Sequence, residues 1–249
     1  MKKFVCSAFL LVGAFVASAQ SLTALEIISK ADEARQGESS YNESEMTIVR
    51  PKWSRSYSIK SWTKGNDLSL IKITAPAKDA GQGYLKIDKD LWNWMPSIDR
   101  MIKMSSSIMG QSWMGSDFTN DDMVRQVSIV DDYSQKLLGE EKVREYDCWK
   151  IELIPDEDAP VVWDRTVCWV DKRTFGIVKT ENYDEDGILV QLIDSYDLKP
   201  YGKRVIPTRT EVIPVQEEGK KTVMVMKKAQ FDQKIDNNFF SQQNLKRLK

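Results

Sequence analysis

Beyond its N-terminal region, the chain is a succession of short runs that alternate polar and apolar residues, separated by tight turn signals. In the run 53–62, for example, Tyr57 and Ile59 fall on one side and serines fall on the other, which is the pattern of a half-buried strand. Connections such as residues 64–67 and 184–187 are too short for a crossover between parallel strands. The sequence therefore predicts a mainly β fold of the α+β class, built as an antiparallel meander of about eleven or twelve strands.

Such a sheet must bury one face, either against another layer or by curling toward a barrel, and barrels of this size can enclose a ligand. No linker rich in Pro, Gly or Ser divides the chain, so we expect a single sheet around one core. The predicted strands are residues 43–50, 53–62, 68–74, 83–88, 91–95, 133–138, 142–154, 161–170, 176–183, 189–197, 204–213 and 222–231.

One helix is predicted ahead of the sheet, over residues 22–35. Thr23 is followed three residues later by Glu26, the pattern of a capping box, and Gly37 is a plausible stop. Residues at helical spacing give this helix an apolar face. That expected face consists of Leu25, Ile28 and Ala31.

The N-terminus has the three parts of a secretory signal. Two lysines form a short basic start, residues 4–17 are almost wholly apolar, and small residues occupy the positions that a signal peptidase reads. A membrane anchor would need about 20 apolar residues. A lipoprotein signal would need a cysteine after the apolar run, whereas Cys6 lies near its start. We expect residues 1–19 to be removed after Ala19, leaving residues 20–249 as one periplasmic domain.

The composition excludes several classes of function. The 36 basic and 37 acidic residues are nearly balanced, whereas nucleic-acid binding needs a basic surface. The chain has no histidine, which removes the commonest general base, nucleophile activator and metal ligand. We therefore expect no nucleic-acid partner, no cofactor and no histidine-based catalysis, while a pair of carboxylates or a Ser-Lys pair stays open for a hydrolase. Because no second long apolar run follows the signal, we also expect the exported part to be soluble.

A cluster formed by Asp117, Asn120, Asp121 and Asp122 raises the alternative of a metal site. Its spacing does not match an EF-hand loop. Residues 116–123 fit better a helix cap followed by an acidic first turn. We therefore expect no metal here.

Cys148 and Cys168 remain after removal of the signal, an even number in a compartment that permits disulfides. They lie in two β-like runs joined by the turn-rich residues 155–160. If this hairpin is symmetric about residue 158, the two cysteines face each other at about 4.5 Å between Cα atoms, within reach of a disulfide. The prediction is a cross-strand disulfide, with two buried free thiols as the alternative.

Residues 91–123 concentrate large apolar side chains, holding three of the eight Trp and six of the ten Met. Methionine adapts to varied apolar shapes. An apolar loop that contains glycines and can bend is typical of a lid over an apolar pocket. The two tryptophans that alternate in a strand can equally fill a core. The candidate pocket or lid residues are Trp92, Trp94, Met95, Met104, Met109, Trp113, Met114 and Phe118, and the candidate hinges are Gly110 and Gly115.

Three motifs in this half of the chain resemble the LolA-like branch of the outer-membrane lipoprotein-sorting proteins. They are residues 73–81 (ITAPAKDAG), 92–96 (WNWMP) and 114–123 (MGSDFTNDDM). The resemblance implies an unclosed antiparallel β-barrel of about 11 strands with helices packed in its concave face. It implies a periplasmic carrier whose apolar cavity takes lipid or lipoprotein acyl chains, with an inner-membrane transporter and an outer-membrane acceptor as partners. It implies no catalytic residues.

The leading hypothesis is therefore a carrier of acyl chains toward the outer membrane. The alternative is a non-enzymatic accessory subunit of an inner-membrane exporter, with its pocket filled by its own side chains and no lipid cargo. An enzyme acting on lipid or envelope polymer is a third possibility, which the missing histidine and the lack of a nucleophile motif disfavour.

The signal peptide gives the first testable prediction. When the full chain is expressed in a Gram-negative host, the exported product should begin at Gln20, because Ala17 and Ala19 occupy the positions read at cleavage. N-terminal sequencing or intact mass of the periplasmic fraction checks this. A product that keeps Cys6 and sediments with membranes would instead indicate an anchor.

Overall fold

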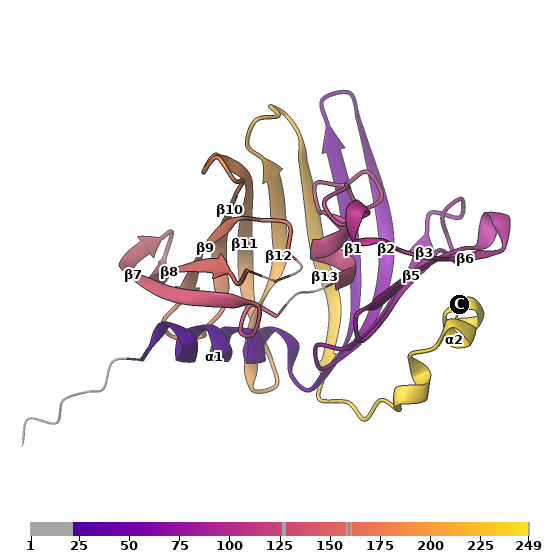
Figure 1. Ribbon diagram of the computed structural model, residues 1–249, viewed down its shortest axis with the longest axis horizontal. Coiled ribbons are helices and arrows are strands. Elements are labelled where there is room, and N and C mark those ends of the chain that lie inside the picture. The colour runs from indigo at the N-terminus through magenta and orange to yellow at the C-terminus, as the bar shows by residue number, and fades with distance from the viewer. Residues whose placement is uncertain (1–21, 126–127, 158, 160, 249) are drawn as a thin grey trace, which may run out of the picture.

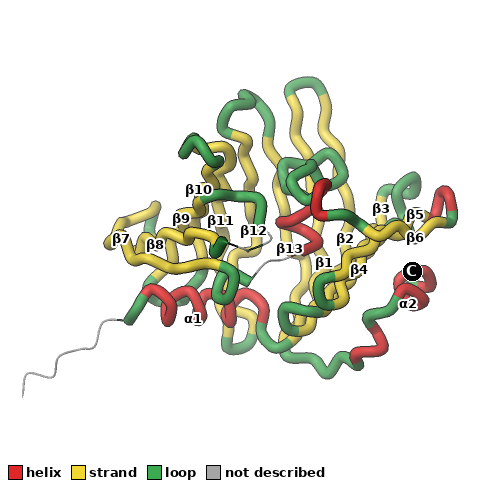
Figure 2. The backbone as a smooth tube through the Cα atoms, viewed as in Figure 1, coloured by secondary structure: helices red, strands yellow, loops and turns green. Residues whose placement is uncertain are grey.

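The computed structural model describes residues 22–125, 128–157, 159 and 161–248, so the predicted signal lies outside the described residues. These residues form one antiparallel sheet with a few short helices (Figure 1). The sheet twists strongly, so that β7–β9 run across the view whereas β1 and β13 run up it (Figure 2). The fold is thus mainly β and unclosed, as predicted.

The helices and strands have the following bounds. The α-helices are α1 (Ala24–Gln36) and α2 (Gln242–Arg247), and the short 3-10 or π turns are η1 (Pro96–Ile98), η2 (Ser106–Ile108), η3 (Asp121–Arg125) and η4 (Asn237–Phe239). The strands are β1 (Ser39–Arg50), β2 (Trp53–Lys64), β3 (Leu68–Ala75), β4 (Gly83–Ile87), β5 (Asp90–Met95), β6 (Arg100–Lys103), β7 (Tyr133–Val143), β8 (Tyr146–Pro155), β9 (Arg165–Asp171), β10 (Ile177–Tyr183), β11 (Leu189–Tyr201), β12 (Arg204–Pro214) and β13 (Lys221–Phe231).

The order of the strands is that of two meanders joined at their ends. The sheet runs β6-β5-β4-β3-β2-β1-β13-β12-β11-β10-β9-β8-β7, so the first strand pairs with the last and β6 and β7 are the two edges. The chain must therefore pass from one edge of the sheet to the other between β6 and β7. Residues 104–132 make this passage, and we call them the crossing segment.

One face of the sheet, which we call the inner face, carries both α1 and the crossing segment. Helix α1 packs over the β7–β9 side, where Ile27 and Ile28 belong to one buried cluster with Ile151. The crossing segment packs over β1–β5, where Trp113 belongs to a second buried cluster with Tyr84. The strand registers place both clusters on the same side of the sheet.

The C-terminal residues cover part of the opposite, outer face. Phe240 and Leu245 pack on β3–β5, and a Cβ added to Gly83 would lie 2.5 Å from Leu245, so only glycine permits this approach. Buried Lys72 donates to the Leu245 carbonyl at 2.7 Å, and burial lowers the pKa of its amine. This arrangement holds α2 beside the β4–β5 hairpin.

The N-terminal helix begins and ends where the sequence predicts. Thr23 and Glu26 form the capping box, and Gly37 closes the helix with a positive φ of 63°. The predicted apolar face is wrong in one position. Leu25 is exposed, whereas Ile27 is buried beside Ile28 and Ala31.

The strand count and the placement of the helices also need correction. The sheet has 13 strands rather than about 11, and the strand without a counterpart in the prediction is β6, whose four residues are too few to show an alternation. Only α1 and the short turns of the crossing segment lie on the inner face, because α2 packs outside. Among the described residues, no helix is long and apolar enough to cross a membrane.

The predicted disulfide between Cys148 and Cys168 is wrong, because both are buried free thiols. Cys168 lies opposite Ile151, and Cys148 lies opposite Asp171. The β8–β9 register thus differs by three positions from a hairpin centred on residue 158. An odd shift reverses the face of a strand, so Cys168 packs in the inner cluster with α1 and Cys148 packs with Trp169 on the outer face.

These thiols should be unreactive in the folded protein. Burial raises the pKa of Cys148 to about 11 and that of Cys168 to about 12, and the thiolate is the reactive form. We expect a chain beginning at Gln20 to resist maleimide at neutral pH, and to take up two labels when it is unfolded without reductant. Mass spectrometry counts the labels. A count that rises only after reduction would contradict two free thiols.

Candidate functional site: a lid over an inner-face cleft

The middle of the crossing segment is a compact hairpin that bonds mostly to itself. Residues 108–121, which we call the lid, are held by Trp113 N to Phe118 O at 2.8 Å and by Asn120 N to Gln111 O at 2.9 Å. Its tip is a tight turn in which Met114 and Gly115 have φ of 53° and 77°, closed by Ser116 N to Trp113 O at 3.0 Å. Two successive positive φ values match a type I′ turn.

The underside of the lid is part of the core. Trp113 is 0% exposed and its ring lies 5.4 Å from that of Tyr84, while Met109 is buried beside it. The Trp113 indole nitrogen has no hydrogen-bond partner within the described residues. An unpaired buried donor costs about 1–3 kcal/mol. Apolar contacts therefore hold the underside of the lid, and they leave the buried indole donor of Trp113 without a hydrogen bond.

The tip of the lid is latched to β1 by an ion pair. The Arg50 guanidinium donates to both Asp117 carboxylate oxygens at 2.9 and 3.0 Å and to the Gly115 carbonyl at 2.9 Å. The two charged side chains are only 12% and 7% exposed. Thr222 on β13 donates to the same carboxylate at 2.7 Å. Because this geometry is bidentate and largely shielded from water, it is stronger than a surface ion pair.

A chain of buried amides supports the latch from the other half of the sheet. Thr166 donates to Asn182 at 2.8 Å, Asn182 donates to Gln191 at 2.7 Å, and Gln191 donates to the Asp117 backbone carbonyl at 2.7 Å. These side chains cross β9, β10 and β11 on the inner face. The lid tip is thus tied to strands on both sides of the β1–β13 junction.

Thr119 and Asp122, at the C-terminal end of the lid, form the predicted helix cap. The Thr119 hydroxyl accepts from the Asp122 amide at 3.0 Å, and the Asp122 carboxylate accepts from the Thr119 amide at 2.8 Å, the reciprocal pattern of a capping box ahead of η3. Burial raises the pKa of Asp122 above its ordinary value, and the hydrogen bonds from Thr119 oppose that rise. Asp117 and Asp122 therefore have structural partners.

A cleft of about 470 Å³ opens between the lid and strands β2–β6. Its aliphatic lining comes from β6 and the crossing segment, and its polar lining comes from strands β2, β4 and β5, from the β3–β4 loop and from the lid. The tyrosine hydroxyl of Tyr84 accepts from Gln82 at 2.9 Å. The lining residues are Tyr57, Asp79, Gln82, Tyr84, Asn93, Ile102, Met104, Ile108, Ser112, Met114 and Asn120. The cleft thus offers flexible apolar side chains beside a row of hydrogen-bonding groups.

A second cavity of about 290 Å³ lies on the inner face between α1 and strands β10–β13. Ile177, Val205 and Ile206 give it apolar walls, and Arg35 of α1 contributes a charged group to its lining. Both cavities lie between the inner face and segments that cover it.

The structure divides the predicted site residues between the two faces. Met104 and Met114 line the cleft, Met109 and Trp113 are buried beneath the lid, and Phe118 packs at its margin. Trp92 and Trp94 point to the outer face and pack with the C-terminal residues, so they do not line the cleft. Met95 ends β5 and is not among the residues that line the cleft.

The two predicted hinge glycines differ in their surroundings. Gly115 occupies the positive-φ turn at the lid tip, with open space where a side chain would project. Gly110 has no positive φ and lies 3.6 Å from Val162, measured from an added Cβ. Whether either residue serves as a hinge stays a prediction.

Several site residues escaped the sequence reasoning. The latch residues Arg50 and Thr222 look like ordinary strand ends, and the cleft residue Ile102 lies in the short strand that was missed. Tyr57 was placed on the correct side of its strand, but no local signal related it to the lid, because that contact joins residues far apart in the chain.

Comparisons with known proteins agree with this architecture. A family model described as "Uncharacterized protein" matches residues 65–247, most of the chain. A DUF1329 family protein from Desulfovibrio piger is 27% identical, with a TM-score of 0.82 over 89% of this chain and 97% of its own. The chain belongs to the LolA-like family.

Two further solved structures are similar to nearly the whole chain. A putative outer membrane lipoprotein-sorting protein domain from Vibrio parahaemolyticus is 25% identical, with a TM-score of 0.79 over 90% of this chain and 98% of its own. A LolA superfamily protein from Nitrosomonas europaea is also 25% identical, with a TM-score of 0.77 over 90% and 99%. Among curated proteins, none matches the chain. The resemblance of this LolA-like protein thus extends over nearly the whole of each neighbour.

The latch gives a prediction for the Asp117→Asn variant. Losing the charge should weaken the lid by on the order of 2–3 kcal/mol, because Arg50 is left without its anion. Hydrogen exchange at lid amides such as Trp113 should then be about a hundredfold faster. Glu45→Gln, which breaks an exposed pair with Lys227, is the control and should change little. Equal protection of the lid in Asp117→Asn and wild type would show that the latch does not hold it.

Proposed function

We propose that this LolA-like protein is a periplasmic carrier that binds lipid or lipoprotein acyl chains beneath the lid, for transfer toward the outer membrane. The observation that carries the proposal is the lidded cleft, whose lining combines Met104, Ile108 and Met114 with hydrogen-bonding side chains. Two solved relatives described as a lipoprotein-sorting domain and a LolA superfamily protein support it. The predicted signal sequence supports the compartment.

The cleft suits an amphiphile better than a purely apolar molecule. Its volume of about 470 Å³ lies within the usual range for ligand pockets, about 300–1,000 Å³. Acyl chains would lie on the methionine and isoleucine side chains, where burial contributes about 0.8 kcal/mol per CH₂. The hydroxyl of Tyr84 and the amide of Asn93 would face the ester, amide or glycerol part of the same molecule.

Larger cargo requires the lid to move, because Trp113 and Met109 fill the inner face beneath it. Opening would break the Arg50–Asp117 pair and expose apolar surface. It would also relieve the unpaired indole donor of Trp113 and the left-handed backbone of Met114, which cost of order 1–3 kcal/mol each. An acyl chain that replaced Trp113 against Tyr84 would restore the lost apolar contact.

The filled inner face favours one other candidate. A protein whose own side chains occupy the space could act as a non-enzymatic accessory subunit that docks on an inner-membrane exporter and carries no lipid. The buried lid is the observation on its side. The missing histidine favours a binding role over catalysis in both candidates, because the commonest general base is absent.

Binding of a fluorescent fatty-acid probe tests the carrier. We expect saturable binding in wild type and loss of about tenfold in affinity in Met114→Asp, because a carboxylate would then face the acyl chain. Ile188→Asp, at an exposed turn far along the sheet, is the matched control and should bind normally. Asp117→Asn should bind the probe faster than wild type, because its lid opens more readily.

Native mass spectrometry of gently purified protein provides the second readout. A carrier should show adducts of lipid mass that Met114→Asp lacks. Absence of adducts together with absence of probe binding would reject the carrier and leave the accessory subunit.

A further inference from the structure

The β5–β6 hairpin ends in an exposed apolar tip at one edge of the sheet. Residues 95–103, which we call the arm, include five consecutive exposed residues, from Pro96 to Arg100. Ile98 at the turn is 54% exposed and Ile102 on β6 is 42% exposed, the two large exposed apolar side chains in this part of the chain. The hairpin tip thus presents exposed apolar side chains at the edge of the sheet.

Positive charges surround the arm. Arg100 and Lys103 belong to β6, and Lys246 and Arg247 end the neighbouring helix α2. The Lys246 amine lies 4.6 Å from the Trp94 ring and the Lys103 amine lies 5.8 Å from the Trp92 ring. Asp99 lies at the turn, and Asp90 of β5 pairs with Lys103 at 2.7 Å. The arm and α2 together therefore carry four cations and one carboxylate.

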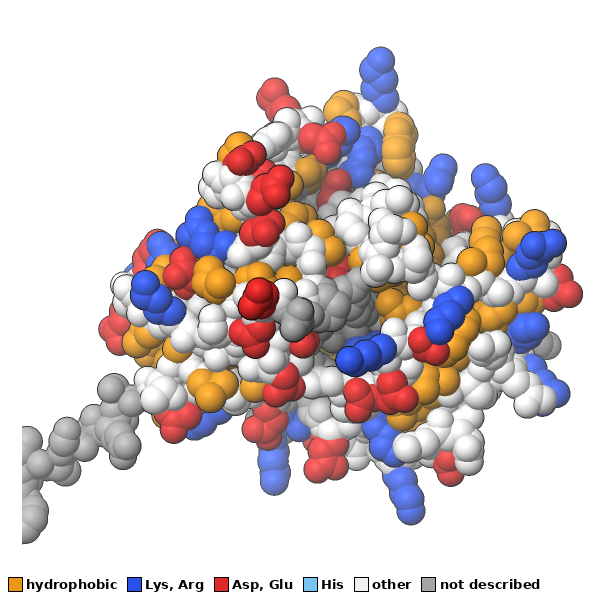
Figure 3. Space-filling view, in the orientation of Figure 1, with side chains coloured by type: hydrophobic (Ala, Val, Ile, Leu, Met, Phe, Trp, Pro, Cys, Tyr) orange, Lys and Arg blue, Asp and Glu red, His pale blue; other side chains and the backbone are white. Residues whose placement is uncertain are grey.

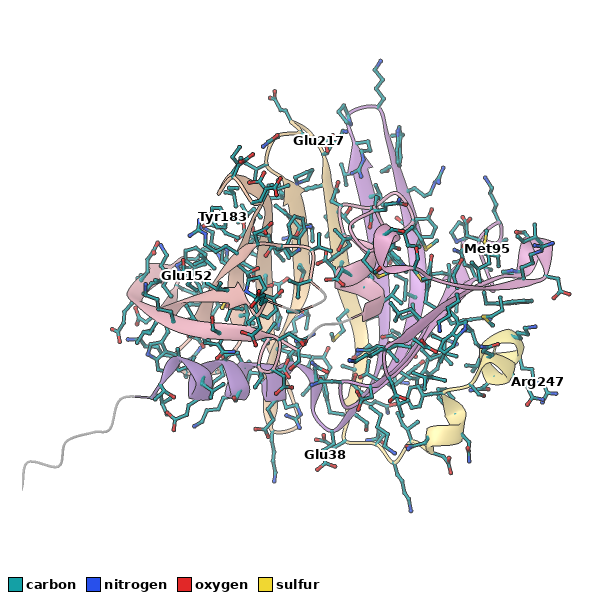
Figure 4. The ribbon with its side chains drawn as sticks, viewed as in Figure 1. Glu38, Met95, Glu152, Tyr183, Glu217 and Arg247 are labelled. Atoms are coloured by element: carbon teal, nitrogen blue, oxygen red, sulfur yellow. The ribbon has the colours of Figure 1, made fainter. Side chains whose placement is uncertain are left out.

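The figures show this edge as one surface. Met95 of the arm and Arg247 of α2 both lie at the right-hand end of the molecule (Figure 4). Hydrophobic side chains gather there with Lys and Arg among them, over the region where Figure 1 places β3–β6 (Figure 3). Exposed aliphatic residues with cations among them are the composition of protein surfaces that rest at a bilayer interface.

We propose that the arm, with the end of α2, docks on the surface of a bilayer that contains anionic lipid. Ile98 and Ile102 enter the interface, and Arg100, Lys103, Lys246 and Arg247 face the headgroup phosphates. A convex tip suits a deformable lipid surface, whereas a protein partner would need a matching pocket.

The position of the arm gives this docking a consequence for cargo. Ile102 is exposed on the arm and also lines the cleft, as does Asn93 of β5 opposite it. The chain continues from Lys103 into Met104, another residue of the cleft lining. The mouth of the cleft therefore opens beside the docked edge. This part of the inference rests on the proposed carrier function, whereas the docking itself does not.

Co-sedimentation with vesicles tests the docking. The purified protein is mixed with vesicles of phosphatidylcholine alone or with added phosphatidylglycerol. We expect binding that requires phosphatidylglycerol and weakens as salt is raised. Ile98→Glu should reduce the partition coefficient about tenfold, because it removes the apolar anchor and adds a negative charge.

The matched control is Ile188→Glu. Ile188 is 48% exposed, a fraction similar to that of Ile98. It lies in the turn between β10 and β11, in the half of the sheet where Figure 4 labels Tyr183, away from the arm. The variant should sediment like wild type. Lys246→Gln combined with Arg247→Gln should lower binding to anionic vesicles and remove part of its salt dependence. Circular dichroism establishes that each variant is folded, as expected for exposed positions.

Three outcomes would overturn the proposal: no sedimentation of wild type with anionic vesicles, equal loss in Ile98→Glu and Ile188→Glu, or binding that is indifferent to phosphatidylglycerol. The fatty-acid probe separates the two proposals. Ile98→Glu should still bind the probe, since Ile98 does not line the cleft. Vesicle binding without probe binding would support docking of the arm and reject the carrier. Probe binding without vesicle binding would support the carrier and reject docking of the arm.

Discussion

The pairing of β1 with β13 determines the course of the rest of the chain. By joining the first strand to the last in the middle of the sheet, it sends β6 and β7 to opposite edges. The residues between them must cross a whole face, and a crossing segment buried on a sheet must satisfy its own backbone groups. Residues 108–121 do so by folding into a hairpin. The lid is thus a consequence of strand order rather than an insertion into the fold.

The lid combines two kinds of attachment that respond differently to a ligand. Its underside is held by apolar contacts of Trp113 and Met109, which an acyl chain can replace in kind. Its tip is held by the Arg50–Asp117 pair and the Gln191 amide, which an acyl chain cannot replace. A ligand of suitable length can therefore exchange with the underside while the tip keeps the lid attached to the sheet.

Local features of the fold were predictable from the sequence, and features that depend on register were not. The capping box at Thr23 and the cap formed by Thr119 and Asp122 each depend on residues only three positions apart, and the structure confirms both. The pairing of Cys148 depends on where a long hairpin turns, and an error of three residues reversed its face. The same limit applies to Trp92, whose alternation with Trp94 gave a common face but not which of the two faces it was.

Only residues 104–107 separate the arm from the lid, which joins the proposed docking edge to the proposed gate. β6 ends at Lys103, and the Met104 amide donates to the Leu91 carbonyl at 2.8 Å ahead of the lid. A bilayer contact at Ile98 would hold the N-terminal end of the crossing segment, while Arg50 holds its tip from the middle of the sheet. The lid spans these two supports, so a movement of either one relative to the other changes the width of the cleft that Ile102 and Met114 line between them.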